Sequence, residues 1–333
     1  MQKRPIWKRP VSFSLLGMLF ALSTFLSACG SGSSVNSDSI QNDGNGQKVI
    51  HIGYQKNDPL MILKERRTLE KRLKSAGVKV KWTEFQDGPA LLEALNAGSL
   101  DLGRTGETPP IFAQAAGSSL VYIAVGKTKS KGSGILVRKN SSIHSLSDLK
   151  GKTIGFSKGT SSHYLVVKAL NKAGLKFTDI HPAYLKPGDA RVAFEQGKID
   201  AWVVWDPYTA DAQNTMDARL LVDGEGLITD RDFFLTSEAY AKNHSDILKM
   251  VMEEVQKSSE WTNHHQKEAA AMLSDILKID PSSMLMAIKR REYGVDKLTP
   301  DIIQEQQEIA DTFYRLKMIP KKVDVKQRMH KLE

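Results

Sequence analysis

The feature of this sequence that most constrains the fold is a repeated alternation of short β-rich runs with helical segments from residue 48 onward. The run V-I-H-I-G-Y at residues 49–54 favours a strand, and residues 58–76 carry apolar side chains at mostly helical spacing. Further strands are predicted at 78–85, 100–103 and 120–125, with helices at 89–97 and 109–116 between them. A β-α-β series of this kind predicts a mostly parallel sheet with helices on both faces.

A second series of the same kind follows a Lys-, Gly- and Ser-rich segment at residues 127–134. Its predicted strands are 135–137, 153–156, 180–184, 201–205 and 220–222, and its helices are 161–173, 188–196 and 207–213. Residues 233–236 favour a strand that returns to the first lobe, and the remainder is predicted helical at 245–264, 267–277, 282–290, 299–316 and 323–331.

The expected fold class is therefore α/β with two lobes. Residues 48–132 and 227–333 would form the first lobe, and residues 133–226 the second. Ligands of open α/β sheets bind beyond the carboxyl ends of the strands, so the expected site is a cleft between the lobes.

The first 28 residues have the pattern of a secretory signal peptide. Lys3, Arg4, Lys8 and Arg9 form a positive region without an acidic residue, and residues 11–28 carry no charge. Serine, threonine and glycine dilute this apolar run, which favours a cleaved signal over a membrane-spanning helix. The mature protein is therefore expected outside the cytoplasm.

The apolar run ends in Leu26-Ser27-Ala28-Cys29, and small residues directly before a cysteine suit a lipoprotein signal peptidase. Cys29 would then carry the acyl chains that anchor the mature chain to the cell membrane. It is the only cysteine, so an intrachain disulfide is impossible, and the alternative is a secreted protein with one unused thiol. Residues 29–47 are nearly all polar or glycine and predict a flexible tether.

The charge pattern argues against a nucleic-acid partner. The formal net charge is +9, and removing the four positive residues of the signal leaves +9 − 4 = +5. Charges of both signs are mixed throughout, and no basic block is interleaved with aromatic residues. A mildly basic surface could gather anions, although a solvated surface of mixed charge is the simpler explanation.

Three loops that follow predicted strands and open predicted helices form the candidate site. They cover residues 104–109, 157–163 and 205–208, and together combine glycine, hydroxyl and aromatic residues. Glycine lets the backbone approach a ligand, and the first turn of a helix offers unpaired N–H groups and a positive dipole end. Converging loops would hold a small anion, whereas each loop alone is more often ordinary turn and cap chemistry.

Several side chains in these loops have more than one possible role. Trp205 and Tyr208 could form a wall beside an organic group, although a tryptophan that ends a strand often belongs to the core. Arg104 could pair with an anion, pair with Glu107 or reach solvent. His163 lies in the first turn of its helix and could be a neutral donor or a surface residue.

Enzyme chemistry has little support in the sequence. The motifs G-x-S-x-G and H-E-x-x-H are absent, and no G-x-G-x-x-G follows a strand. His264 and His265 are adjacent on a predicted helix and would point to different sides, which disfavours a metal site. We therefore expect no catalytic residue, no metal and no cofactor.

Seven segments carry a family resemblance: GYQK (53–56), LLEALNAGSLDLG (91–103), TGETPPIFAQAAG (105–117), KGTSSH (158–163), DARVAF (189–194), DAWVVWDPY (200–208) and IPKKVD (319–324). They closely resemble the aliphatic sulfonate-binding proteins of ABC transporters, within the sulfonate, taurine and nitrate group. The resemblance covers essentially the whole chain after the tether. It implies a type II periplasmic-binding-protein fold that captures alkanesulfonates for sulfur acquisition and delivers them to a membrane permease and its ATPase.

The resemblance also implies a pocket. Matched by motif, Gln55 and the three loops would form it. Its sulfonate donors would be Gln55, Thr105, Thr160 and Ser161, and Trp205 would lie beside the alkyl part. Family members often carry a small residue where Arg104 stands, so Arg104 would change the size and charge of the pocket. The predicted ligand-binding residues are Gln55, Arg104, Thr105, Gly106, Glu107, Thr108, Gly159, Thr160, Ser161, Ser162, His163, Trp205, Asp206 and Tyr208.

The implied mechanism is binding and hand-over by a monomer that bends at hinges near residues 132–135 and 225–232. The alternative ligands are another small anion or a heterocycle, such as taurine, nitrate or a thiamine precursor. The alternative function is an enzyme on the same fold, because one fold can host many functions.

Overall fold

The computed structural model describes residues 46–332. The predicted signal peptide, the lipidation of Cys29 and most of the predicted tether lie outside the described residues. Within residues 46–332, no helix is both long enough and apolar enough to cross a membrane.

The first sheet has the strand order β11-β4-β10-β3-β1-β2. Its strands are β1 (Lys48–Tyr54), β2 (Val78–Glu84), β3 (Leu102–Gly106), β4 (Leu120–Thr128), β10 (Arg231–Ser237) and β11 (Val295–Asp296). β2 and β3 are parallel to β1, whereas β10 lies antiparallel between β3 and β4. The predicted strand that returns from the second half of the chain is therefore confirmed, and it enters the middle of this sheet.

The second sheet has the order β7-β6-β8-β5-β9. Its strands are β5 (Ser133–Arg138), β6 (Thr153–Phe156), β7 (His181–Tyr184), β8 (Ala201–Trp205) and β9 (Ala218–Asp223). β7 and β8 are parallel to β6, whereas β5 is antiparallel to both β8 and β9.

Both sheets are thus mixed. The α/β class with two helix-flanked sheets is confirmed, and most strands of each sheet run in one direction. The antiparallel pairs arise at the two connections between the sheets, because β5 and β10 are the first strands after each crossing and both enter antiparallel to their neighbours. The boundaries of the two lobes stay a prediction.

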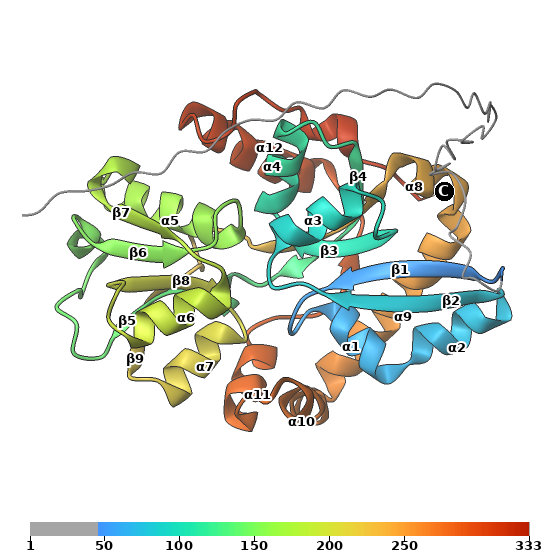
Figure 1. Ribbon diagram of the computed structural model, residues 1–333, viewed down its shortest axis with the longest axis horizontal. Helices are drawn as coiled ribbons and strands as arrows, with labels where there is room; N and C mark the ends of the chain where they lie inside the picture. Colours follow the sequence, from blue (N-terminus) through green and yellow to red (C-terminus); the bar gives the residue numbers. More distant parts are fainter. Residues whose placement is uncertain (1–45, 333) are drawn as a thin grey trace, which may run out of the picture. The chain divides into compact units, whose positions relative to one another are not determined.

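Helices flank both sheets in Figure 1. They are α1 (Pro59–Arg66), α2 (Thr68–Ser75), α3 (Gly88–Asn96), α4 (Thr108–Ala115), α5 (Ser161–Lys172), α6 (Pro187–Glu195), α7 (Tyr208–Thr215), α8 (Glu238–Asn243), α9 (Ser245–His264), α10 (Gln266–Leu277), α11 (Pro281–Lys289) and α12 (Pro300–Arg315). Short 3-10 turns occur at Ser130–Gly132, Leu146–Leu149, Phe177–Asp179 and Val325–Arg328.

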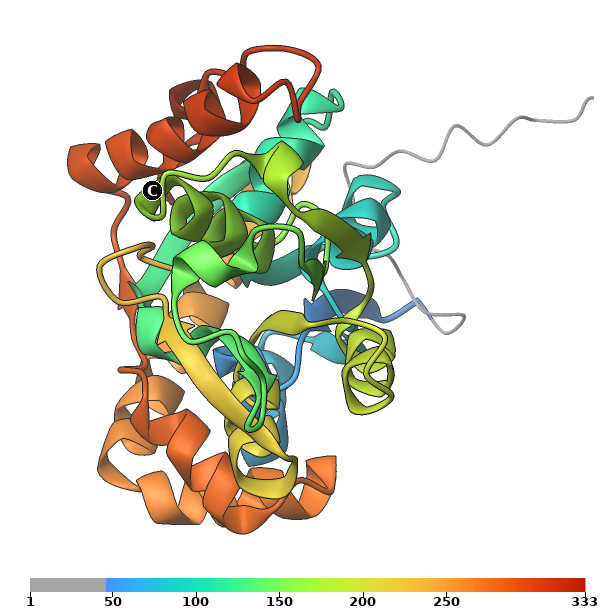
Figure 2. The ribbon, with the colours of Figure 1, turned by 90° about the vertical axis from the view of Figure 1, so that its left-hand side faces the viewer.

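The C-terminal helices divide into two groups. Figure 2 shows α10 and α11 (orange) at one end of this view and α12 (red) at the other. α11 packs against α7, and α12 packs against α4. The ring of Phe313 on α12 also lies 5.0 Å from the ring of His163 on α5. Each group therefore connects the C-terminal part of the chain to helices of the second series.

Two predicted helices differ from the structure. Residues 58–76 form two helices, because Arg67 adopts a left-handed conformation with φ of 54° that ends α1. Residues 323–331 contain only a 3-10 turn, because the Gln307 side chain on α12 bonds to the carbonyl of Val323 and the N–H of Val325. Those bonds hold the segment against α12 and use the backbone groups that a helix would need.

The strand predicted at 100–103 begins and ends later, as β3. Phe233 and Asp232 of β10 pair with Thr105 and Gly106, which extends β3 through three residues that were predicted to lie in a loop. Arg104, Thr105 and Gly106 are therefore held by the sheet.

Leu91 on α3 packs closely over the first sheet, and two glycines make room for it. Leu91 is fully buried, and a Cβ at Gly103 would lie 2.4 Å from its Cδ2 atom. A Cβ at Gly53 would lie 3.2 Å from its Cγ atom. The glycines thus set the distance between α3 and strands β1 and β3. The ends of these two strands supply Gln55 and residues 104–106 to the cavity between the sheets.

We predict that Gly103→Ala lowers the free energy of unfolding by about 1–3 kcal/mol, because the added methyl overpacks the Leu91 contact. The matched control is Gly188→Ala, since Gly188 lies in the first turn of α6 and a Cβ there meets nothing closer than 3.8 Å. The control should be neutral or stabilising, as alanine is the better helix former. Urea unfolding measures both, and equal effects would contradict the packing explanation.

Candidate functional site

A cavity of about 560 Å³, counting space open to solvent, lies where the two sheets meet. Its walls come from the segments that follow β1, β3 and β8, from the start of α5 and from both connections between the sheets. This is the place predicted from the rule that ligands of α/β sheets bind beyond the carboxyl ends of strands.

Eight of the fourteen predicted residues line this cavity: Gln55, Arg104, Thr105, Gly106, Thr160, Ser161, Trp205 and Asp206. The other six are not in its lining: Glu107, Thr108, Gly159, Ser162, His163 and Tyr208. The structure thus brings the three predicted loops together at one cavity, while a ligand-binding role for each residue stays a prediction.

Sequence reasoning missed several lining residues, including Lys129, Asp230 and Arg291. Lys129 lies in the Lys-rich segment that was interpreted only as a crossover, so its composition was the available signal. Arg291 follows α11, far along the chain, and nothing in the local sequence marks it. Lys56 also lines the cavity, directly after Gln55.

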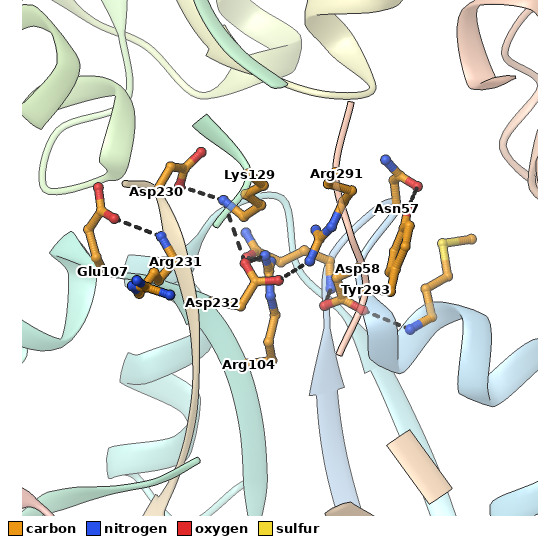
Figure 3. A network of polar contacts seen from close by, with 12 residues as sticks. Asn57, Asp58, Arg104, Glu107, Lys129, Asp230, Arg231, Asp232, Arg291 and Tyr293 are labelled. Atoms are coloured by element: carbon orange, nitrogen blue, oxygen red, sulfur yellow. Dashed lines mark hydrogen bonds and ion pairs between the residues drawn. The ribbon is translucent and has the colours of Figure 1, made fainter. Parts of the chain in front are cut away.

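A buried network of ion pairs surrounds Asp232, which is fully buried on β10 (Figure 3). Its carboxylate pairs with the guanidinium groups of Arg104 and Arg291, and the ammonium of Lys129 lies 3.5 Å away. Lys129 also pairs with Asp230, which accepts a hydrogen bond from the Ser133 hydroxyl. The network therefore joins β3, β10, both connections between the sheets and the segment after α11.

Burial and mutual charge set the pKa values in this network. Burial lowers the pKa of Arg104 to about 10 and that of Lys129 to about 8. Burial also works to raise the pKa of Asp230, but the Lys129 ammonium and neighbouring hydroxyls hold it below its usual value. The side chains of Arg104 and Lys129 thus remain cationic near neutral pH.

The cavity wall carries an excess of positive charge. Four cations line it, namely Lys56, Arg104, Lys129 and Arg291, against the two carboxylates of Asp206 and Asp230. An anion that enters would reduce this excess, whereas a cation would increase it.

The structure excludes two of the roles left open for Arg104, pairing with Glu107 and exposure to solvent, while pairing with an anion stays a prediction. It pairs with Asp232 rather than Glu107, its side chain is only 7% exposed, and it lines the cavity. Its Nη1 atom donates to Oε1 of Gln55 at 3.3 Å. Since that oxygen is occupied, the NH2 group of Gln55 is the part of the amide available as a donor.

The predicted open helix N-termini are present at only one of the three loops. No side chain caps α5, whose N-cap residue Thr160 and first residue Ser161 line the cavity. α4 begins Thr108-Pro109-Pro110, and prolines carry no N–H group to donate. In α7, the N–H of Ala210 already donates to Asp206 Oδ1 at 2.9 Å. The start of α5 is therefore the helix end suited to an anion.

The cavity hydroxyls differ in their freedom to donate. Thr160 Oγ1 donates to the carbonyl of Ser157 at 2.7 Å, so its proton is used within the loop. Thr105 Oγ1 is buried without a hydrogen-bond partner among the described residues. Because buried polar groups are normally satisfied, the Thr105 hydroxyl is the better candidate for a ligand contact.

The end of β3 approaches the start of α5 closely at Gly106. A Cβ at this position would lie 2.5 Å from the Ser161 hydroxyl oxygen, so a larger residue would have to displace that hydroxyl. This contact places the end of β3 against the start of α5, and it brings the Thr105 hydroxyl and the α5 N-terminus to the same cavity.

Trp205 and Asp206 end β8 at the cavity wall. Trp205 is partly exposed, while Trp202 is the tryptophan buried in the core. The carboxylate of Asp206 lies 3.3 Å from the guanidinium of Arg290, which follows α11. Burial raises the pKa of Asp206 to about 7 despite this arginine. Tyr208 lies instead in a second, neighbouring cavity.

His163 is neither a surface residue nor a cavity donor. It is 1% exposed and lies among the rings of Phe112, Phe156 and Phe313. Its Nδ1 accepts a hydrogen bond from the N–H of Gly159 at 3.3 Å. Burial lowers its pKa to about 3, with a smaller contribution from Lys158, so it is neutral as one prediction proposed.

Glu107 has a structural position behind the cavity. Its Oε2 accepts from the N–H of Arg231 at 2.8 Å, and burial together with Asp230 raises its pKa to about 8. Among residues 46–332, no group of three histidine, cysteine or acidic side chains is arranged to hold a metal ion.

Comparisons with known proteins agree with this arrangement. Residues 73–269 match the family described as NMT1/THI5 like. The chain is 42% identical to an aliphatic sulfonates-binding protein of Escherichia coli (strain K12) over 85% of its own length and 88% of that protein. It is 36% identical to a protein of the same description in Bacillus subtilis (strain 168), over 93% and 92% of the two chains.

A solved structure gives the same picture. The alkanesulfonate-binding protein SsuA from Xanthomonas axonopodis pv. citri, bound to MOPS, is 38% identical and superposes with a TM-score of 0.82. The match covers 85% of this chain and 98% of that one.

We predict that His163 makes folding sensitive to acid. Its pKa is about 3 in the folded chain and near 6.5 when unfolded, so between these values the unfolded chain binds an extra proton. The free energy of unfolding should therefore fall as pH falls from about 6.5, by up to about 1.4 kcal/mol per pH unit. Urea unfolding from pH 7 to pH 4 should show a shallower dependence for His163→Phe than for the wild type.

The control is His181→Phe, because His181 is exposed on the edge strand β7. It should leave the pH dependence unchanged. An unaltered slope in His163→Phe would show that other groups cause the acid sensitivity.

Proposed function

The chain belongs to the NMT1/THI5-like family and, within it, to the aliphatic sulfonate-binding proteins, and on this basis we propose that it captures alkanesulfonates for an ABC importer. Its partners would be a membrane permease and, through it, the ATPase. Relatives of this kind include periplasmic binding proteins, which supports a position outside the cytoplasm.

The observation that carries this proposal is the convergence of anion-binding groups from both sheets on one cavity. The uncapped start of α5 belongs to the part of the chain that contains the second sheet. The unpartnered Thr105 hydroxyl lies on β3 of the first sheet. Cations surround them, and Trp205 offers an apolar surface at the same cavity. A sulfonate headgroup with an alkyl tail has the matching chemistry.

Binding requires no covalent step. Backbone N–H groups of α5, the Thr105 hydroxyl and the Gln55 amide would donate to the sulfonate oxygens, and the tail would lie along Trp205. The cations around Asp232 and Asp230 are already held in place by ion pairs, so little reorganisation would be needed when the anion arrives. Hinges at residues 132–135 and 225–232, on the two connections between the sheets, would open the cavity for release to the permease.

We also propose that the mature protein acts as a monomer tethered to the cell membrane through lipid on Cys29. The support is the charged start, the uncharged run and the Leu-Ser-Ala-Cys sequence at residues 26–29. A flexible tether from residue 29 to residue 47 would let the folded part reach the permease.

We predict that isothermal titration calorimetry with C2–C8 alkanesulfonates detects binding, and that Thr105→Val weakens it about ten-fold or more. The substitution removes the hydroxyl but keeps the shape, and a hydrogen bond to a charged group contributes about 1.5–3 kcal/mol. The matched control is Thr108→Val, because the Thr108 hydroxyl is also buried without a partner among the described residues but does not line the cavity. It should leave affinity within about two-fold.

The same titration should include nitrate, taurine and a pyrimidine thiamine precursor. Binding of one of these, with no response to any alkanesulfonate, would exclude the proposed ligand class. Loss of affinity in both threonine variants would point to a structural effect in place of a ligand contact.

We predict that Cys29→Ala moves the protein from the membrane fraction to the soluble fraction of cells that export it. Without the thiol, no acyl chain can be attached, and residues 46–332 contain no helix long and apolar enough to cross a membrane. Ser27→Thr, which leaves the cysteine intact, serves as the control. Unchanged membrane association of Cys29→Ala would refute the lipid anchor.

A further inference from the structure

A separate cavity lies between α5 and the end of α12, and it shares no lining residue with the candidate site. Its volume is about 900 Å³, counting space open to solvent. Five of its ten lining residues are apolar: Val167, Leu170, Leu175, Phe177 and Leu316. Three are cationic, namely Lys168, Lys176 and Arg315, and none is acidic. We call this cavity the basic groove.

The three cations of the basic groove form no ion pair with any residue in the range 46–332. The Arg315 guanidinium donates to the hydroxyl of Thr312 at 3.1 Å, and the Lys168 ammonium lies 5.9 Å from the centre of the Tyr164 ring. The carboxylate of Asp179 accepts from the backbone N–H of Lys176 at 2.8 Å, and not from its ammonium. The side-chain charges are therefore available to an anion.

The chain after α12 adds further cations next to the basic groove. Residues 316–332, which we call the strap, include the IPKKVD motif and contain six Lys or Arg residues and one acidic residue, Asp324. The buried side chains of the strap are Ile319, Val323 and Val325. Its exposed cations are Lys317, Lys321, Lys322, Lys326 and Lys331. The strap therefore turns its apolar residues toward the protein and its lysines toward solvent.

Acidic residues of α12 offset part of this charge. They are Asp301, Glu305, Glu308 and Asp311, of which Glu305 pairs with Arg231 at 2.9 Å. Residues 161–179, α12 and the strap together contain ten Lys or Arg residues and six Asp or Glu residues. This part of the surface thus keeps an excess of positive charge, and its acidic residues lie outside the lining of the basic groove.

The strap ends at the edge of the first sheet where the chain enters β1. β3 and β4 are both antiparallel to β10, and β1 is parallel to β3, so β1 and β4 begin at the same edge. Near the start of β4, the carbonyl of Tyr122 accepts from the N–H of His330 at 2.9 Å. Figure 1 accordingly shows the C-terminus beside α8, which follows β10.

This edge is also where the proposed lipid tether joins the folded part. β1 and β4 are three positions apart in the strand order, which corresponds to about 14 Å. A flexible chain of the length of residues 29–47 spans roughly 25 Å on average. The membrane that holds the lipid on Cys29 is therefore within reach of the strap.

We propose that the basic groove and the strap bind anionic phospholipids of this membrane. The cations pair with phosphate headgroups, and the apolar residues of the groove contact the upper part of an acyl chain. Charge complementarity and the edge shared with the tether favour a lipid surface over a protein partner. The contact goes beyond the proposed capture of sulfonates, and it fixes the orientation of the folded part on the membrane.

The test is cosedimentation of the full mature chain with phospholipid vesicles, using Cys29→Ala so that no acyl chain contributes. Vesicles of phosphatidylcholine with about 30% phosphatidylglycerol should bind this chain at least about ten-fold more tightly than pure phosphatidylcholine. Raising the ionic strength from about 0.1 M to about 1 M shortens the Debye length from about 10 Å to about 3 Å and should remove most of the binding. Equal binding to both kinds of vesicle would overturn the proposal.

Replacing Lys168, Lys176 and Arg315 together by glutamine should weaken binding to the anionic vesicles by about ten- to a hundred-fold. Each cation near such a surface contributes up to about five-fold in affinity. The matched control replaces the exposed Lys267, Lys278 and Lys289 by glutamine, because α10 and α11 lie at the other end of Figure 2 from α12. Equal weakening by the two sets would show that net charge, and not the basic groove, causes the binding.

Leu316→Asn tests the apolar part of the contact without changing the charge. The Leu316 side chain is 42% exposed, so the substitution leaves the core intact, and it should weaken binding to the anionic vesicles several-fold. Unchanged vesicle binding in both Leu316→Asn and the triple glutamine variant of the groove would exclude the basic groove and leave it to a protein partner.

Titration of each variant with an alkanesulfonate provides the control for folding, since the basic groove is separate from the candidate site. The variants should bind the sulfonate as the parent chain does. Failure of all chains to bind any sulfonate would refute the proposed function, whereas the vesicle results would still decide the lipid contact.

Discussion

The interaction on which the site depends is the grouping of three cations around the buried carboxylate of Asp232. A buried carboxylate without counter-charges is strongly unfavourable, and so are buried arginines without a carboxylate. Because Arg104, Lys129 and Arg291 come from separate parts of the chain, the network holds β3, the first connection and the segment after α11 in one arrangement. It is the frame against which the proposed anion-binding groups are positioned.

This arrangement separates structural charges from the groups that are free to bind. The carboxylates of Asp230 and Asp232 are occupied by protein cations, and the Thr160 hydroxyl by a backbone carbonyl. The Thr105 hydroxyl and the start of α5 are not used in this way. An anion can therefore be neutralised by groups that folding has already ordered, without disturbing the ion pairs that hold the two sheets together.

Much of the fold followed from pattern alone, since the alternation of strands and helices depends on local apolar periodicity. The helix at Ser245–His264 and the returning strand were predicted close to their observed bounds. The extension of β3 was not, because its last residues become a strand only by pairing with β10. Likewise, His163 looked like a cavity residue by position, and only packing shows it enclosed by aromatic rings.

The sequence by itself predicts an export signal, and it determined the two α/β series, the three loops that meet at the cavity and the family resemblance. These are properties of neighbouring residues or of quoted motifs. The tertiary structure decided which loop keeps an open helix end, which hydroxyl lacks a partner and which cations line the cavity. The physical reason is that hydrogen-bond satisfaction and charge pairing depend on residues far apart in the chain, such as Arg104 with Asp232 and Arg290 with Asp206.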